Sequence, residues 1–87
     1  MEEYVQVTVR SLKNEWKEMD IRVHTGQSWD YITGVLTENG LIKTAEKRTY
    51  RSVRQNRFFE GTQNSIQAGI YTGDIIEMGG TVGWKDR

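Results

Sequence analysis

The sequence predicts an α+β domain in which one helix packs across a mixed sheet of four to five strands. Three observations carry this prediction. Apolar and polar residues alternate in two N-terminal segments, a helical period follows over residues 28–39, and short strand-like segments return after residue 49. A chain of 87 residues supports one hydrophobic core. We therefore expect a single domain over residues 1–78 and a flexible C-terminal tail over residues 79–87.

The first two segments predict a β-hairpin. Val5, Val7 and Val9 alternate with polar residues over residues 4–12, which is the period of a half-buried strand. The alternation resumes over residues 18–24, and the polar residues between the two segments predict the turn. The outward positions of this hairpin are all polar: Gln6, Thr8, Asp20 and Arg22.

The helix is predicted to begin after Ser28, a favourable N-cap residue, and to end at Asn39-Gly40. Its core face is predicted from four apolar residues at helical spacing, Trp29, Ile32, Val35 and Leu36. Gly34 lies inside the helix, where glycine costs about 1 kcal/mol relative to alanine. It lies beside Tyr31 and away from the predicted core face. This pair is a candidate partner-binding spot, and the alternative is a tolerated imperfection.

The second half of the chain predicts a return to the sheet, in the order β-β-α-β-β-β. Short strands are predicted over residues 50–53 and 58–59, and the pattern leaves open which face of the former points inward. Residues 62–73 are predicted to form a loop anchored by Ile66 and Ile70. A last strand is predicted over residues 74–78. We expect it to pair in parallel with the first strand, because the helix allows the crossover.

Composition excludes several classes of function. The chain has no cysteine and one histidine, which excludes disulfides, thiol nucleophiles, thiolate metal sites and clusters of histidine ligands within one chain. Apolar runs are too short for a membrane span or a signal peptide. No catalytic triad, paired carboxylates or phosphate-binding glycine motif is recognisable. We therefore expect a protein that is not an enzyme and holds no metal or cofactor.

Charge is balanced overall and concentrated locally. Twelve basic and twelve acidic residues give a net charge of zero, yet residues 43–57 hold six lysines and arginines against one glutamate. Four arginines recur there at every third position and form the predicted partner-binding stretch: Arg48, Arg51, Arg54 and Arg57. Such a stretch suits an acidic protein, anionic lipid or nucleic acid, and the alternative is a solvated face balanced by acidic neighbours.

The second half of the sequence resembles the ubiquitin-like signature. Phe58-Phe59-Glu60-Gly61 and Ser65-Ile66 lead to Gly73-Asp74, which opens the last strand in that signature. Gly73 would supply a permissive turn backbone, and the Asp74 side chain would cap the turn. Within the superfamily, residues 50–61 and the valine-rich first strand are most similar to the small YukD-like proteins that accompany Gram-positive type VII secretion systems.

This resemblance implies a ubiquitin-like β-grasp fold and a non-catalytic, cytoplasmic accessory or regulatory protein. Its implied partners are cytoplasmic domains of the membrane-embedded secretion subunits. Two alternatives stay open. The first is a covalent modifier processed at Gly79-Gly80, although this diglycine directly follows the predicted strand and lacks the flexible arm that an activating enzyme needs. The second is a nucleic-acid-binding domain that uses residues 43–57.

Overall fold

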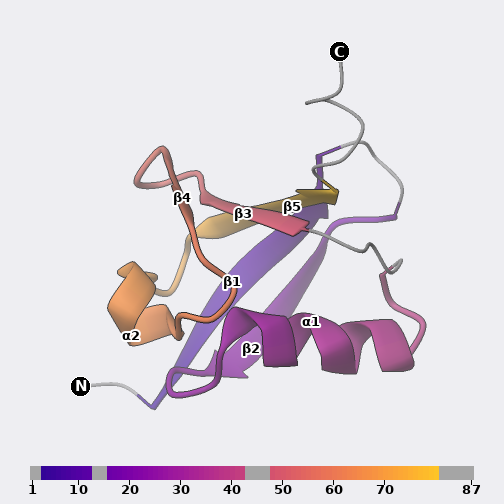
Figure 1. Ribbon diagram of the computed structural model, residues 1–87, viewed down its shortest axis with the longest axis horizontal. Coiled ribbons are helices and arrows are strands. Elements are labelled where there is room, and N and C mark those ends of the chain that lie inside the picture. Colours follow the sequence, from indigo (N-terminus) through magenta and orange to yellow (C-terminus); the bar gives the residue numbers. More distant parts are fainter. Residues whose placement is uncertain (1–2, 13–15, 43–47, 81–87) are drawn as a thin grey trace.

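A computed structural model describes residues 3–12, 16–42 and 48–80 of the chain. Five strands form one sheet, and the longer helix lies across one face of it (Figure 1). The elements in chain order are β1 (Tyr4–Ser11), β2 (Met19–His24), α1 (Trp29–Glu38), β3 (Arg48–Ser52), β4 (Arg57–Phe59), α2 (Ser65–Ala68) and β5 (Ile75–Gly80). The predicted order of strands and helix is confirmed, and α2 is added to it.

The strands lie side by side in the order β2-β1-β5-β3-β4. β1 pairs antiparallel with β2 and parallel with β5, while β3 pairs antiparallel with both β5 and β4. The parallel contact between the first and last strands is confirmed. It is possible because α1 lies in the connection that a parallel pair requires.

The core lies between α1 and the face of the sheet that α1 covers, which we call the inner face. Alternate residues of β1 are buried there, as the period of two predicts. The inward direction of β3 is now defined, because Tyr50 and Ser52 are buried and Arg51 points to the opposite, outer face. The buried apolar side chains are Val5, Val7, Val9, Val23, Trp29, Ile32, Leu36, Ile42, Tyr50, Ile70, Ile76 and Met78.

The α1 helix begins where predicted, because the Ser28 hydroxyl accepts a hydrogen bond from the Tyr31 N–H at 3.1 Å. The prediction that Val35 joins the core is wrong. Val35 is 38% exposed, whereas Thr33 is fully buried. At 100° per residue, Thr33 lies nearer than Val35 to the middle of the buried arc. The Thr33 hydroxyl lies 3.1 Å from the Tyr50 hydroxyl, which makes its burial tolerable.

The loop predicted over residues 62–73 contains the single-turn helix α2. Asn64 caps it, and the side chains of Asn64 and Gln67 each accept a hydrogen bond from the other's backbone N–H. This capping box was the signal in the sequence for α2. Ile70 is buried as predicted, but Ile66 is 48% exposed and anchors nothing in the core, because it lies on the outward side of this turn.

The last strand, β5, extends to Gly80 rather than ending at Met78. Gly79 and Gly80 pair with Thr49 and Arg48 of β3. A Cβ atom at position 79 would lie 2.9 Å from a methyl carbon of Leu12, so this position favours glycine. Residues 81–87 lie outside the described residues, and the flexible tail beyond Gly80 stays a prediction.

Candidate protein-interaction site

Three of the four arginines of the predicted binding stretch, Arg51, Arg54 and Arg57, do not form one surface. Arg51 points to the outer face of the sheet, opposite Glu77 of β5. Arg57 pairs with Ser52, whose side chain faces inward, so Arg57 projects from the other face. Arg54 lies in the turn between β3 and β4. The side chain of Arg48 lies outside the described part of the structure.

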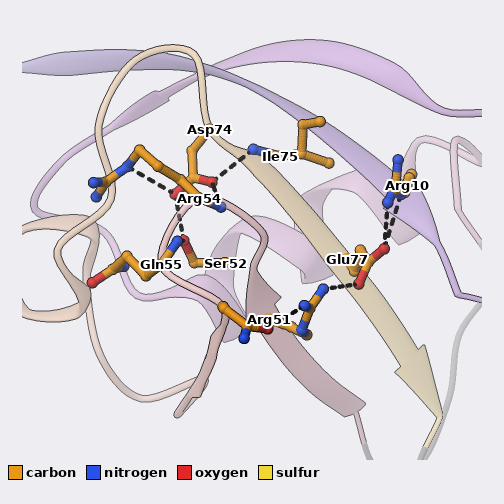
Figure 2. Close-up of polar contacts among 9 residues, drawn as sticks. Arg10, Arg51, Ser52, Arg54, Gln55, Asp74, Ile75 and Glu77 are labelled. Carbon is orange, nitrogen blue, oxygen red and sulfur yellow. Dashed lines mark hydrogen bonds and ion pairs between the residues drawn. The ribbon is translucent and has the colours of Figure 1, made fainter.

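Arg51 takes part in an ion-pair cluster that ties three strands together on the outer face (Figure 2). The Glu77 side chain is 11% exposed and lies between Arg10 of β1 and Arg51 of β3. Its two oxygens accept hydrogen bonds from Arg10 Nη2 at 2.5 Å and from Arg51 Nη1 at 2.7 Å. These two arginines therefore neutralise a carboxylate of the same chain, and β1, β5 and β3 are held in register.

The environment of Glu77 favours its charged form. The hydrogen bonds from Arg10, and then the one from Arg51, hold the pKa of Glu77 below its ordinary value, against the opposing effect of burial. Arg51 also donates to Asn56 in the turn that follows β3. The contacts of Arg51 are thus explained by the fold itself.

Arg54 belongs to a second polar cluster, centred on the buried carboxylate of Asp74. This carboxylate accepts hydrogen bonds from the Ser52 hydroxyl at 2.6 Å and from the N–H groups of Arg54 and Ile75 at 3.0 and 2.8 Å (Figure 2). Gly73 precedes it with a φ of 97°, a conformation that favours glycine. The permissive backbone expected of Gly73 is confirmed, whereas the Asp74 side chain caps the turn after β3 and binds the first N–H of β5.

The side chain of Arg54 packs around the same turn. Its guanidinium donates to the Gly69 carbonyl and lies 4.7 Å from the centre of the Tyr71 ring. Its Nε is 3.8 Å from an oxygen of Asp74. Sequence reasoning missed both carboxylate partners, Asp74 and Glu77. Of the predicted stretch, Arg57 is the one with no polar side-chain contact among the described residues.

Tyr31 and Gly34 lie together on the solvent side of α1, as predicted. They belong to a strip at positions i, i+3, i+4 and i+7, formed by Tyr31, Gly34, Val35 and Glu38. Tyr31 is 56% exposed. A Cβ atom at Gly34 would have no atom within 4 Å, so the backbone of α1 is open to solvent there. We call these four residues the α1 strip.

A shallow groove of about 510 Å³ opens beside α2. Its walls come from β1, α2 and the segment before β5, and no charged side chain lines it: Val5, Thr25, Ser65, Ile66, Gly69, Ile70, Tyr71 and Thr72. Phe58 of β4 is 62% exposed. Phe59 packs against Trp29 and Tyr50.

Within the described residues, no three histidine, cysteine, aspartate or glutamate side chains are grouped so that they could hold a metal ion. His24 has a structural contact, because its Nδ1 accepts the N–H of Gly26 at 3.0 Å and its ring packs edge-on against Tyr4. No helix in this part of the chain is long and apolar enough to cross a membrane.

No protein-family model and no curated protein matches the sequence. Among solved structures, a protein designed de novo on the basis of ubiquitin is 13% identical, covers 90% of this chain and 89% of its own, and superposes with a TM-score of 0.68. The C-terminal ubiquitin-like domain of mouse tubulin-specific chaperone e is 10% identical, with 91% and 88% covered and a TM-score of 0.66. At these identities the likeness concerns the fold, and the chain has the ubiquitin-like β-grasp fold.

Proposed function

We propose that this chain is a non-catalytic protein-interaction domain, and that it serves as a cytoplasmic accessory or regulatory component of a type VII secretion system. The observation that carries the interaction role is the α1 strip. It places an exposed tyrosine and an exposed valine around an open stretch of helix backbone. Exposed aromatic residues are common at the centres of protein interfaces.

The buried polar groups of the domain support binding rather than catalysis. Glu77 and Asp74 are each held by several donors from their own fold. Every buried side-chain nitrogen and oxygen of the described residues has a hydrogen-bond partner. A buried acid or base that serves catalysis instead faces a cleft that can admit a substrate.

The secretion role rests on the resemblance of residues 50–61 and of the first strand to the YukD-like proteins of Gram-positive bacteria. The proposed partners are cytoplasmic domains of the membrane-embedded secretion subunits. The arginine stretch, Arg48 included, is proposed as a second contact. Among its described side chains, Arg57 has no ion pair, and Arg51 and Arg54 contribute from their structural positions. Gly79 and Gly80 belong to β5 and pair with β3. This pairing argues against processing at the diglycine, because an activating enzyme needs that segment outside the sheet.

An affinity pull-down from the native host tests this proposal. The tag is placed at the N-terminus, and the eluate is analysed by mass spectrometry after native and then denaturing washes. We expect secretion-subunit peptides after the native wash and their loss under denaturing conditions. The Tyr31→Ala variant should recover less of them, whereas Tyr4→Ala, which removes an exposed tyrosine outside both α1 and the arginine stretch, should not. Absence of secretion subunits, or recovery only of species covalently linked through Gly80, would contradict the proposal.

A further inference from the structure

We propose that the α1 strip binds a basic amphipathic peptide segment of a partner protein. An apolar side chain of that segment lies on Gly34 beside Tyr31, and its lysine or arginine side chains pair with Asp30 and Glu38, which flank Gly34 one turn before and one turn after it. This inference rests on the proposed role as an interaction domain and specifies the chemistry of its partner.

The apolar part of the argument comes from the spacing on α1. Tyr31 and Val35 are one helical turn apart and are 56% and 38% exposed. Gly34 lies on the same side of the helix, with nothing within 4 Å of where its Cβ would be. The strip therefore has bare backbone along the edge marked by Gly34 and two exposed apolar side chains next to it, which lets another chain approach closely.

The charge on α1 selects the partner. The helix sequence WDYITGVLTE holds two carboxylates and no lysine or arginine. Asp30 and Glu38 are two turns apart, both are exposed, and neither forms an ion pair with a described residue. The Oδ1 of Asp30 accepts a hydrogen bond from the Tyr50 hydroxyl at 2.9 Å, so its charge is not neutralised by a cation. Their carboxylates are complementary to a basic segment and repel an acidic one or a nucleic acid.

Glu38 also lies where a negative charge is unfavourable for the helix. The last turn of α1 contains no basic residue, and the carbonyl end of a helix repels a carboxylate. Gly34, inside the helix, also weakens α1 locally. Both Glu38 and Gly34 therefore disfavour the helix, and both lie on the strip that exposes Tyr31 and Val35. Such local departures from helix preference gather at functional surfaces.

The outer-face arginines and the groove beside α2 indicate the chemistry of a partner less clearly than α1 does. The outer-face arginines, Arg10 and Arg51, already pair with Glu77. The groove beside α2 has no charged side chain in its lining, so it offers no charge complementarity to any one class of partner. Among the described residues, α1 combines exposed apolar side chains with two exposed carboxylates that no ion pair neutralises.

The test uses the full chain labelled with ¹⁵N and two synthetic probe peptides of fourteen residues. Both peptides carry leucines at helical spacing, and the remaining positions are lysine in one and glutamate in the other. We expect the lysine peptide to shift the amide resonances of residues 30–38 in a saturable titration. The glutamate peptide should bind at least about ten-fold more weakly, because Asp30 and Glu38 repel it.

Two substitutions in the strip sharpen the test. Gly34→Arg covers the open backbone and adds a positive charge, and Glu38→Lys reverses one carboxylate. Each should weaken binding of the lysine peptide about ten-fold. Glu18→Lys makes the same charge change at an exposed glutamate outside α1, and its affinity should stay within about two-fold of the wild type. Circular dichroism verifies that every variant is folded.

Several outcomes would overturn the inference. These are equal binding of both peptides, shifts confined to the groove beside α2 or to residues 48–58, and no shift at millimolar peptide. The pull-down separates this failure from that of the proposed function. If Gly34→Arg recovers secretion subunits as well as the wild type does, the function stands and the strip is not the contact. If the lysine peptide binds α1 but no secretion subunit is recovered, the strip stands and the secretion role fails.

Discussion

Glu77 of β5 lies directly opposite Arg51 of β3, and its Oε1 accepts a hydrogen bond from the Arg51 Nη1 at 2.7 Å. The second oxygen of the same carboxylate is bound by Arg10 of β1. One carboxylate near the middle of the outer face thus joins both neighbouring strands. Arg51, which was expected to contact a partner, is thereby part of the ion-pair cluster that holds three strands of the sheet together.

Removing the charge of Glu77 should destabilise the domain. Glu77→Gln keeps the shape of the side chain but leaves two guanidinium groups without their anion. Because the Arg10 side chain is 39% exposed and therefore screened by water, we expect a loss of only about 1–2 kcal/mol in the free energy of unfolding. Urea unfolding measures it. Glu18→Gln, at an exposed position, should change the value by less than about 0.5 kcal/mol. Equal stabilities of the two variants would refute the role assigned to Glu77.

The same carboxylate should make stability depend on pH in the acid range. The pKa of Glu77 is lowered in the folded state, chiefly by the hydrogen bond from Arg10, whereas its ordinary value is 4.5. The unfolded chain therefore binds this proton more readily, and the stabilisation is present above about pH 4.5 and lost as pH falls through the lower folded value. The difference in unfolding free energy between wild type and Glu77→Gln should shrink as the pH falls below about 4.5. Urea unfolding at a series of pH values measures this difference, and a constant difference would exclude the mechanism.

Asp74 should be the more sensitive of the two carboxylates, because it is 1% exposed. In Asp74→Ala, the Ser52 hydroxyl and the N–H groups of Arg54 and Ile75 lose their acceptor. We expect a loss of about 3–5 kcal/mol in the free energy of unfolding, since buried donors are left unpaired. Asp74→Asn retains one carbonyl oxygen for the two N–H groups and should lose less. Thermal unfolding ranks the three proteins, and an alanine variant as stable as the asparagine variant would contradict this account.

Much of the fold could be predicted because it depends on local patterns. The alternation of Val5, Val7 and Val9 and the Ser28 cap each act within a few residues. The pairing of Arg51 with Glu77 could not be predicted in this way. These residues are 26 positions apart, and their contact depends on the register between β3 and β5. A helical wheel also misplaced Val35, because a small polar residue such as Thr33 can occupy the core when its hydroxyl has a partner.

The position of Tyr31 and Gly34 could be predicted from the sequence, whereas the arrangement of the arginine stretch could not. Tyr31 and Gly34 were identified together because helical spacing alone places them on one face, and the structure has them there. The arginine stretch has a spacing of three, which has no fixed meaning in a segment that forms a strand, a turn and a second strand. The side chains of Arg51, Arg54 and Arg57 consequently point in different directions.

The two glycines Gly34 and Gly79 should respond oppositely to alanine. At Gly34 an added methyl group meets no atom within 4 Å, and alanine favours the helix. Gly34→Ala should therefore raise the free energy of unfolding by about 0.5–1 kcal/mol, which corresponds to a Tm increase of about 2–8 °C in a domain of this size. At Gly79 the methyl group would lie 2.9 Å from a Leu12 carbon, so Gly79→Ala should lower the Tm unless the Leu12 side chain moves away. The double variant Gly79→Ala with Leu12→Ala tests that cause, because removing the Leu12 side chain should cancel the part of the loss due to the clash. A decrease in Tm for Gly34→Ala would show that the helix backbone at this position is covered, and would contradict the open strip on α1.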